Sequence, residues 1–417
     1  MLKEILKNKV DYLLVFLLII FSGNPALTGQ PQFDAIIVLF AFFLLAYSIR
    51  RNKFVITPTF TKIVIIFSVI LVVQTINFLF FPVRTILGFY VRLYIAFAVF
   101  SSVKNFSYVF VKIMVVLSVI ALILHYLRIT IGVDLPSLFQ PLADIIDVSI
   151  VRRQATFFHT FFLDPKDKLR NAGMFWEPGA FAGYLILAIV LLSLIKNEIV
   201  KKEHVISLSI LSAALLSTKS TMGYMCFPFA LLLHLDFNRE KVRSVISGKI
   251  LLLSFIIIPF IVVISFYAYN NVKFIGEKFE RKIAQTTSQK GNWQITRVGT
   301  FLFDLNYIKQ RPLTGWGANP KTRFSLNPEM IGKHLGMGNG MSDFAVKYGL
   351  IGLFTFIFFI WKNFQYYYGN KYLSFLAVFT VILTLQGEAF LGYPLYIGLM
   401  FLNEGQKNTK IRRMITW

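Results

Sequence analysis

The sequence predicts an all-α, polytopic membrane protein with about twelve transmembrane helices. Hydrophobic residues make up 56% of the 417 residues, charged residues only 15%, and the mean hydropathy is +0.65. Soluble domains have about a quarter of their residues charged. Apolar runs of about 17 to 22 residues recur along most of the chain, and each is long enough to cross a hydrocarbon core. Because lipid offers the backbone no hydrogen bonds, these runs must be helical.

The predicted spans follow the apolar runs in chain order. They cover residues 11–29, 33–49, 60–81, 85–102, 106–127, 178–195, 204–217, 220–235, 249–269, 341–361, 371–387 and 389–403. Two long connections interrupt them, so the sequence predicts one membrane domain over 1–417 with a loop insert at 128–177 and a larger one at 271–340. The larger insert is predicted to contain two short amphipathic helices. Their apolar faces consist of Phe274, Phe279 and Ile283, and of Val298, Phe301, Leu302, Leu305 and Ile308.

Basic side chains gather in alternate connections, which sets the orientation. The basic connections are 50–53, the turn at Lys104, 196–204, 236–248, 361–371 and the tail 405–417. The short turns of the other set carry only Arg84 and Lys219. Since basic loops stay in the cytoplasm, the sequence predicts that both termini are cytoplasmic and that both inserts are periplasmic.

Charge and cysteine content exclude several function classes. The formal net charge of +23 would suggest nucleic acid in a soluble protein, but here many Lys and Arg residues mark topology, so no nucleic-acid partner is expected. Cys226 is the single cysteine, which excludes an intrachain disulfide, a zinc site and a redox pair.

Two arginines lie on the predicted span 85–102 and the turn before it. Arg92 is surrounded by apolar residues about 10 Å below the external surface, where a guanidinium is costly unless it faces a polar cavity or a partner. Arg84 lies one to two turns above it. Together they suit a phosphate-bearing substrate, because each guanidinium donates two bonds at once. The alternatives are a structural ion pair or snorkelling for Arg92, and a solvated turn for Arg84.

A second candidate group ends the first insert, where Arg170 is followed by Glu177 and Pro178. Pro178 suits the first turn of a helix, so Glu177 is placed at a helix N-terminus, where a carboxylate is stabilised. Glu177 is therefore a helix cap, a general base, or a residue that orients a substrate hydroxyl.

The third group belongs to the larger insert. Arg297 begins the predicted amphipathic helix, and Arg311-Pro312 ends it before a turn at Gly315 and Gly317. Further polar residues follow at His334, Asn339, Asp343 and Lys347. His334 alone is more often structural than catalytic, and Asp343 suits a helix cap.

The order and placement of these motifs resemble the Wzy-type O-antigen and capsular polysaccharide repeat-unit polymerases, which are related to the O-antigen ligases. The motifs span about residues 80–355. They are Arg92, Arg170-x-x-Gly173-x-Phe-x-Glu177-Pro178, Ser220-Thr221-x-Gly223-Tyr224, Arg297-x-Gly299, Arg311-Pro312-Leu-x-Gly315-x-Gly317, and Asn339 ten residues before Gly349. The ligases typically carry a His before this Asn, whereas Gly338 stands here and His334 lies four positions earlier. This departure favours a polymerase.

The resemblance implies a glycosyltransferase on the periplasmic face of the bacterial inner membrane. Its substrates would be undecaprenyl-pyrophosphate-linked oligosaccharide repeat units, and it would need no metal or other cofactor. The cations would stabilise the leaving pyrophosphate. The implied pyrophosphate- and glycan-binding residues are Arg92, Arg170, Arg297, Arg84, Arg311 and Asn339. Glu177 or His334 would activate the acceptor hydroxyl, and membrane lipids and a chain-length regulator protein would be further partners.

Two alternatives compete with a polymerase. A ligase would transfer the finished glycan to the lipid A core. A transporter or lipid-linked glycan flippase would show internal symmetry and broken helices near the midplane. The sequence shows neither of these features, and two long external inserts suit an enzyme that works on one face.

Overall fold

The computed structural model describes residues 2–50, 56–146, 153–165, 167–235, 297–331 and 339–406. Within these ranges the chain is almost entirely helical. The sheet described there is a two-stranded antiparallel hairpin of β1 (Arg153–Ala155) and β2 (Thr160–Phe162). Five of the described helices are long and apolar enough to cross a membrane. The predicted fold class, an all-α polytopic membrane protein, is therefore confirmed.

The long apolar helices lie where the sequence predicts spans. They are α3 (Phe33–Arg50), α4 (Pro58–Phe78), α5 (Val83–Ser102), α6 (Phe106–Tyr126) with its π-helical extension η1 (Leu127–Ile131), and α15 (Gly340–Tyr368). Other helices of the bundle are α1 (Leu2–Gly23), α8 (Pro178–Leu194), α9 (Lys201–Ser217), α10 (Thr221–Leu232) and α16 (Lys371–Leu385). Short helices connect or cap them, namely α2 (Pro25–Thr28), α7 (Leu135–Ile146), α14 (Pro320–Arg323), η2 (Pro328–Met330), η3 (Phe390–Gly392), α17 (Pro394–Gly398) and η4 (Leu399–Phe401), and the second insert adds α13 (Arg297–Gln310).

Local signals explain where these helices begin. The Thr57 hydroxyl accepts the Phe60 N–H at the start of α4, and Pro58 occupies the first turn. In the same way, the Asn339 side chain accepts the Ser342 N–H at the start of α15. These caps satisfy backbone donors that have no partner within the helix.

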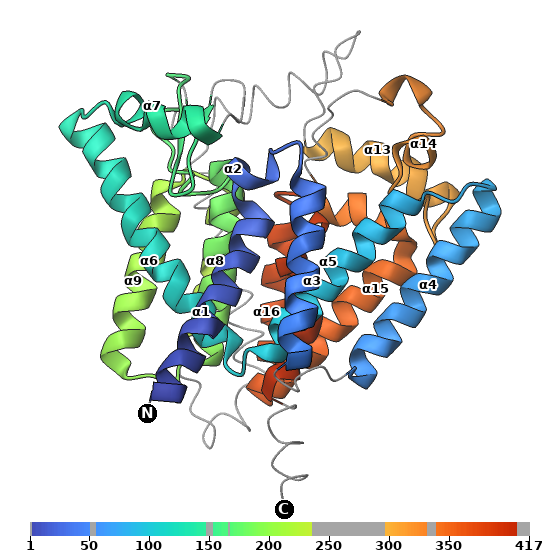
Figure 1. Ribbon diagram of the computed structural model, residues 1–417, viewed down its shortest axis with the longest axis horizontal. Coiled ribbons are helices and arrows are strands. Elements are labelled where there is room, and N and C mark those ends of the chain that lie inside the picture. The colour runs from blue at the N-terminus through green and yellow to red at the C-terminus, as the bar shows by residue number, and fades with distance from the viewer. Residues whose placement is uncertain are drawn as a thin grey trace, which may run out of the picture.

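Helix α8 forms the centre of the left half of the bundle in Figure 1. It is apolar around its whole circumference, nearly all of its side chains are buried, and it packs against α6, α9, α10 and α16. Helices α3 and α4 lie at the periphery and expose large apolar side chains such as Phe42, Leu39 and Ile76. That exposed surface is what lipid contact requires of an outer helix.

The described parts of both inserts lie at the same end of the bundle (Figure 1). Helix α7 of the first insert and helices α13 and α14 of the second are at this end, whereas α1 begins at the opposite end. The Thr59 hydroxyl, at the start of α4, donates to Glu404 (3.0 Å), so the last described residues also lie at the opposite end. The two inserts therefore share one side of the bundle.

The last predicted span, 389–403, differs from the prediction. It is not one helix but the succession of η3, α17 and η4. Pro394 lacks an N–H and begins α17 afresh at its first position. The segment still passes from one end of the bundle to the other. Its beginning, at Ala389, lies against Gly340 at the start of α15, and Gly405, just after it, lies against Val103 at the end of α5.

Helix α13 also departs in part from the prediction. A helix lies where Val298 to Ile308 predict one, but Phe301 and Leu302 are exposed. The face turned into the protein carries Thr300, Asp304 and Tyr307, all buried. The Asp304 carboxylate is buried here because it has partners on α14 and α15, Arg323 and Ser342, which a hydrophobic pattern does not reveal. The predicted span 249–269 and the predicted helix around Phe279 lie outside the described residues.

Candidate functional site

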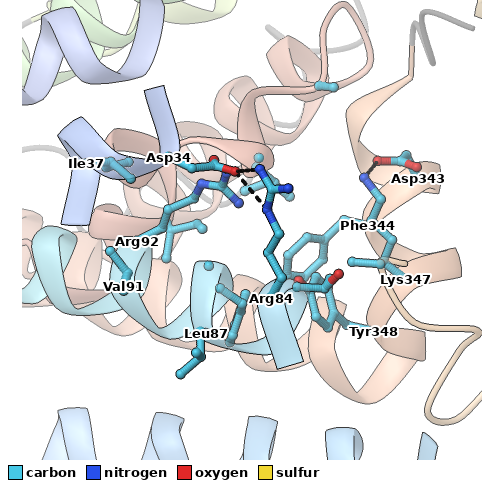
Figure 2. A pocket seen from close by; sticks show the side chains of 18 of the residues that line it. Asp34, Ile37, Arg84, Leu87, Val91, Arg92, Asp343, Phe344, Lys347 and Tyr348 are labelled. Atoms are coloured by element: carbon cyan, nitrogen blue, oxygen red, sulfur yellow. Dashed lines mark hydrogen bonds and ion pairs between the residues drawn. The ribbon is translucent and has the colours of Figure 1, made fainter. Parts of the chain in front are cut away.

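A cavity of about 690 Å³ opens between α3, α5 and α15 near the end of the bundle that carries the inserts. Residues 389–392 close one side of it, and Ala318 of the second insert also contacts it. Most of its lining is apolar. Its charged lining residues are Asp34, Arg84, Arg92, Asp343 and Lys347. In Figure 2, Asp34, Arg84 and Arg92 form one group, and Asp343 and Lys347 form a pair beside it.

Arg84 and Arg92 lie two turns apart on α5 and both turn toward Asp34 of α3 (Figure 2). Arg84 donates to Asp34 through Nη2 (2.5 Å) and Nε (3.2 Å). An Arg92 Nη2 lies 4.0 Å from the other carboxylate oxygen of Asp34. The Arg92 side chain is 33% exposed, against 87% for Arg84, so Arg92 is the inner cation of the pair. Two guanidinium groups thus hold one carboxylate at the cavity wall.

A second charged group enters the cavity from α15. Lys347 Nζ lies 2.5 Å from Asp343 Oδ2, one turn earlier on the same helix. The other oxygen of Asp343 lies 3.4 Å from Nε of Arg323, on α14. Arg323 is 2% exposed and also pairs with the fully buried Asp304 on α13. Four charged residues from three helices therefore connect the second insert to the cavity.

Asp304 is the most deeply buried member of this network. The Ser342 hydroxyl donates to its Oδ2 (2.5 Å), and Arg323 pairs with its Oδ1. Burial raises the pKa of Asp304, whereas the positive charge of Arg323 and the Ser342 hydroxyl act in the opposite direction. A buried carboxylate of this kind needs its partners, because an unpaired charge in the interior is costly.

The turn after α13 is joined to α15 by backbone hydrogen bonds. Residues Trp316 and Gly317 donate to the carbonyls of Val346 and Lys347 (2.7 and 3.0 Å). Leu350 N–H in turn donates to the Pro312 carbonyl (2.7 Å). These bonds exist because α15 is interrupted at Gly349, whose φ of 70° and ψ of 179° are not helical. The free backbone groups of α15 are thus paired with the insert.

Glycines make this docking sterically feasible. Gly315, Gly317 and Gly349 all have positive φ. A Cβ on Gly349 would collide with the Leu313 carbonyl, and one on Gly315 would collide with the Val346 carbonyl. The Gln74 amide of α4 adds a side-chain link, since it donates to the carbonyls of Thr314 and Lys347. The Gly motifs of the sequence therefore shape the connection between the insert and α15.

The structure does not bring all the predicted arginines together. Arg170 does not line the cavity; its Nη1 pairs with Asp167 (3.0 Å) in the turn that ends the first insert. The Arg311 guanidinium lies over the rings of Phe78 and Trp316, 4.4 and 4.8 Å from their centroids. Short-range partners hold both side chains in place, and neither lines the cavity that contains Arg92.

Of the remaining predicted site residues, two are described by the structure, Glu177 and Asn339. Glu177 occupies the N-cap position of α8, makes no side-chain cap hydrogen bond, and lies 4.0 Å from Arg153 Nη2. It does not line the cavity, but its neighbour Trp176 packs against Phe390 of the segment that does. Asn339 caps α15 and donates to Gln386 (2.6 Å). His334 and the side chain of Arg297 lie outside the described part of the chain.

Besides Asp34, the members of the site that were not predicted from the sequence are Arg323 and Asp304. Both are in the second insert, where charged residues are common and a single one carries no signal. The clue was the spacing: Asp304 falls on the same helical face as Thr300 and Tyr307, and Asn319-Pro320 begins the short helix that carries Arg323. In the described ranges no group of three or more His, Cys, Asp or Glu residues is placed to hold a metal ion.

The helical bundle and its charged cavity define a polytopic membrane protein with a polar site at one end of apolar helices. Residues 206–357 match the model of the family described as O-antigen ligase. This match confirms the predicted resemblance to the O-antigen ligase/polymerase superfamily and implies the function of a glycosyltransferase-like enzyme of ligase or polymerase type. The matched segment includes Asp304, Arg323, Asp343 and Lys347. No match was found among curated proteins.

Proposed function

We propose that the protein is a glycosyltransferase that polymerises undecaprenyl-pyrophosphate-linked oligosaccharide repeat units on the periplasmic face of the bacterial inner membrane. The observation that carries the proposal is the position of Arg92. It extends into the cavity from the stretch Gly88–Phe100 of α5, which is otherwise apolar, and Arg84 lies two turns away. An arginine at this depth marks a functional site because its desolvation is costly.

The composition of the cavity suits a lipid pyrophosphate. Guanidinium groups bind phosphate oxygens in pairs and stabilise the charge that develops on a leaving pyrophosphate. Beside Arg84, apolar lining residues such as Leu87 and Val83 are well exposed on the outer surface of α5. A polyprenol tail can therefore remain in lipid along α5 while its pyrophosphate lies at the arginines.

The reaction that these groups would support is a substitution at the anomeric carbon of the donor sugar. The acceptor hydroxyl oxygen forms the new glycosidic bond, and the bond from that carbon to the pyrophosphate oxygen breaks. Lipid pyrophosphate leaves with the electron pair of that bond and is stabilised by Arg92 and Arg84. The hydroxyl proton passes to a general base, for which Glu177 and His334 remain the proposed residues. The step as written requires no metal ion.

Arg170, Arg297, Arg311 and Asn339 are proposed as outer contacts for the glycan or pyrophosphate. Arg170 and Arg311 already have partners in the structure, so a substrate would have to add to those contacts or replace them. Arg170→Ala and Arg297→Ala test this part of the proposal. A chain-length regulator protein is a further proposed partner.

A ligase is the second candidate, because the matched family is described by that activity. The two functions use the same donor chemistry and differ in the acceptor. Purified protein in proteoliposomes, supplied with lipid-linked repeat units and lipid A core, separates them. The proposal expects a ladder of longer lipid-linked glycans that persists in EDTA. A lipid A conjugate without a ladder would establish the ligase instead.

A further inference from the structure

One charged side chain of the cavity has no role in the proposal so far, namely Lys347. It lines the cavity from α15, whereas the two arginines come from α5 (Figure 2). Its side chain is 30% exposed, close to the 33% of Arg92. An ammonium group has three N–H donors. Among the described residues its carboxylate partner is Asp343, so the group can also bind an anion in the cavity.

The position of Lys347 is unusually well fixed. Its backbone carbonyl accepts hydrogen bonds from Gly317 N–H (3.0 Å) and the Gln74 amide (2.8 Å). Its ammonium is held by Asp343, which is only 7% exposed and is itself bound by Arg323. A flexible lysine held at both ends loses little further freedom when it binds a ligand.

The charge balance of the network also points to the cavity. Asp304 and Arg323 form one buried pair, and Asp343 and Lys347 form the next. The first pair is enclosed in the protein, while the second pair lines the cavity and Lys347 is its more exposed member. Exposing the Lys347 ammonium in a mostly apolar cavity does not make the folded protein more stable, so stability alone does not explain its position.

We propose that Lys347 is a third phosphate-binding residue, which contacts the second phosphate of a pyrophosphate held by Arg84 and Arg92. Asp343 is its positioning residue, and Arg323 with Asp304 couples that position to the second insert. The inference rests on the proposed function, since it assigns a further contact to the same ligand. It predicts that the site distinguishes a pyrophosphate from a monophosphate through α15.

Binding of short polyprenyl phosphates to the purified full-length protein tests this assignment. The probes are farnesyl pyrophosphate, farnesyl monophosphate and inorganic pyrophosphate. In Lys347→Met, the affinity for farnesyl pyrophosphate should fall about tenfold or more, as expected for loss of a charge-assisted hydrogen bond, while farnesyl monophosphate binding changes little. Lys347→Arg should restore most of the preference for the pyrophosphate. Inorganic pyrophosphate shows whether the cation site acts without the lipid tail.

Two variants separate positioning from folding. Asp343→Asn keeps the Lys347 ammonium but removes the charge that positions it, so the preference for the pyrophosphate should fall, and thermal unfolding reports any loss of stability. Lys321→Ala is the matched control, because Lys321 is an exposed cation of α14 that does not line the cavity. It should bind all three probes as the unmodified protein does.

The outcomes test the role of Lys347 separately from the proposed function. If Arg92→Ala abolishes binding but Lys347→Met retains the full preference for pyrophosphate over monophosphate, the role of Lys347 is refuted and the proposed function stands. If Arg92→Ala binds farnesyl pyrophosphate as well as the unmodified protein, the proposed function fails.

Discussion

At the scale of single residues, one carboxylate, that of Asp34, is bound by both arginines of the cavity. One oxygen of its carboxylate, Oδ2, accepts from both Nε and Nη2 of Arg84. The carboxylate is 53% exposed, unlike Asp343, which Arg323 and Lys347 enclose. Asp34 is therefore the anion that an incoming pyrophosphate displaces most readily.

Replacing Asp34 by Asn should tighten pyrophosphate binding. The neutral amide no longer competes for Arg84, and an exposed ion pair of this kind is worth up to ~1 kcal/mol, about three- to fivefold in affinity. Titration of the purified variant with farnesyl pyrophosphate measures the change, with Asp167→Asn, the partner of Arg170 outside the cavity, as the control. Weaker binding in Asp34→Asn would show that the carboxylate orients the arginines instead of competing with the ligand.

The sequence predicted the cavity arginines for a physical reason that did not extend to the rest of the site. Arg92 stands out because its neighbours along the helix are apolar, so its charge demands an explanation. Arg323 and Asp304 lie among other polar residues, and their pairing depends on the folding of the insert. Arg170 belongs to a motif that predicted ligand binding, but in the structure its guanidinium pairs with Asp167, three residues earlier in the chain.

At the scale of elements, the interruption of α15 joins the second insert to the cavity. Gly349 takes a backbone conformation open essentially only to glycine, and the turn that contains Gly315 fills the gap. The helix on either side of the interruption was predictable from its apolar pattern. The interruption at Gly349 was not predictable, because nothing in the local sequence shows that another segment would supply the missing backbone partners.

Gly349→Ala should destabilise the protein far more than Gly369→Ala. Both glycines have positive φ, but a Cβ at Gly369 meets open space, whereas one at Gly349 collides with the Leu313 carbonyl. We expect a loss of about 1–2 kcal/mol at Gly369 and about 3 kcal/mol or more at Gly349. Thermal unfolding in detergent compares the two variants, and equal losses would contradict the docking described for this turn.

The hairpin of the first insert should lose stability as the pH falls. Burial lowers the pKa of His159 to about 3, with His125 and Arg128 acting in the same direction. The unfolded chain takes up this proton below about pH 6.5 while the folded chain does not, so the stability present at pH 7 declines by ~2 kcal/mol at pH 5. Hydrogen exchange over residues 153–162 at the two pH values measures it. His159→Gln should remove the difference, and an unchanged pH dependence in that variant would assign it to another group.

At the scale of the whole molecule, the distribution of basic residues predicted which connections lie together. The described parts of both inserts are at one end of the bundle, and the start of α1 and the end of the described chain are at the other (Figure 1). Charge patterning carries this information because lipid and membrane potential act on every connection in the same way. The broken segment 389–401 was beyond that reasoning, since it depends on Pro394 and on packing against α5 and α15.

Labelling of single cysteines tests the orientation of the molecule. Cys226 is buried, so a Cys226→Ser background should react little differently from the natural chain. Leu138→Cys places a thiol on the exposed face of α7, and Val200→Cys places one before α9 at the opposite end. A membrane-impermeant maleimide should label the first in sealed spheroplasts and the second only after permeabilisation. The reverse pattern would place both inserts in the cytoplasm.

The role of Arg92 in the reaction is tested by the rate of glycan elongation by Arg92→Ala in proteoliposomes with lipid-linked repeat units. Arg92 would contact the leaving pyrophosphate, so its loss should slow ladder formation about ten- to a hundredfold. Arg50→Ala, at the other end of the bundle, should leave the rate unchanged. Elongation by Arg92→Ala at the rate of the unmodified protein would contradict the account, because the cavity would then have no part in the reaction.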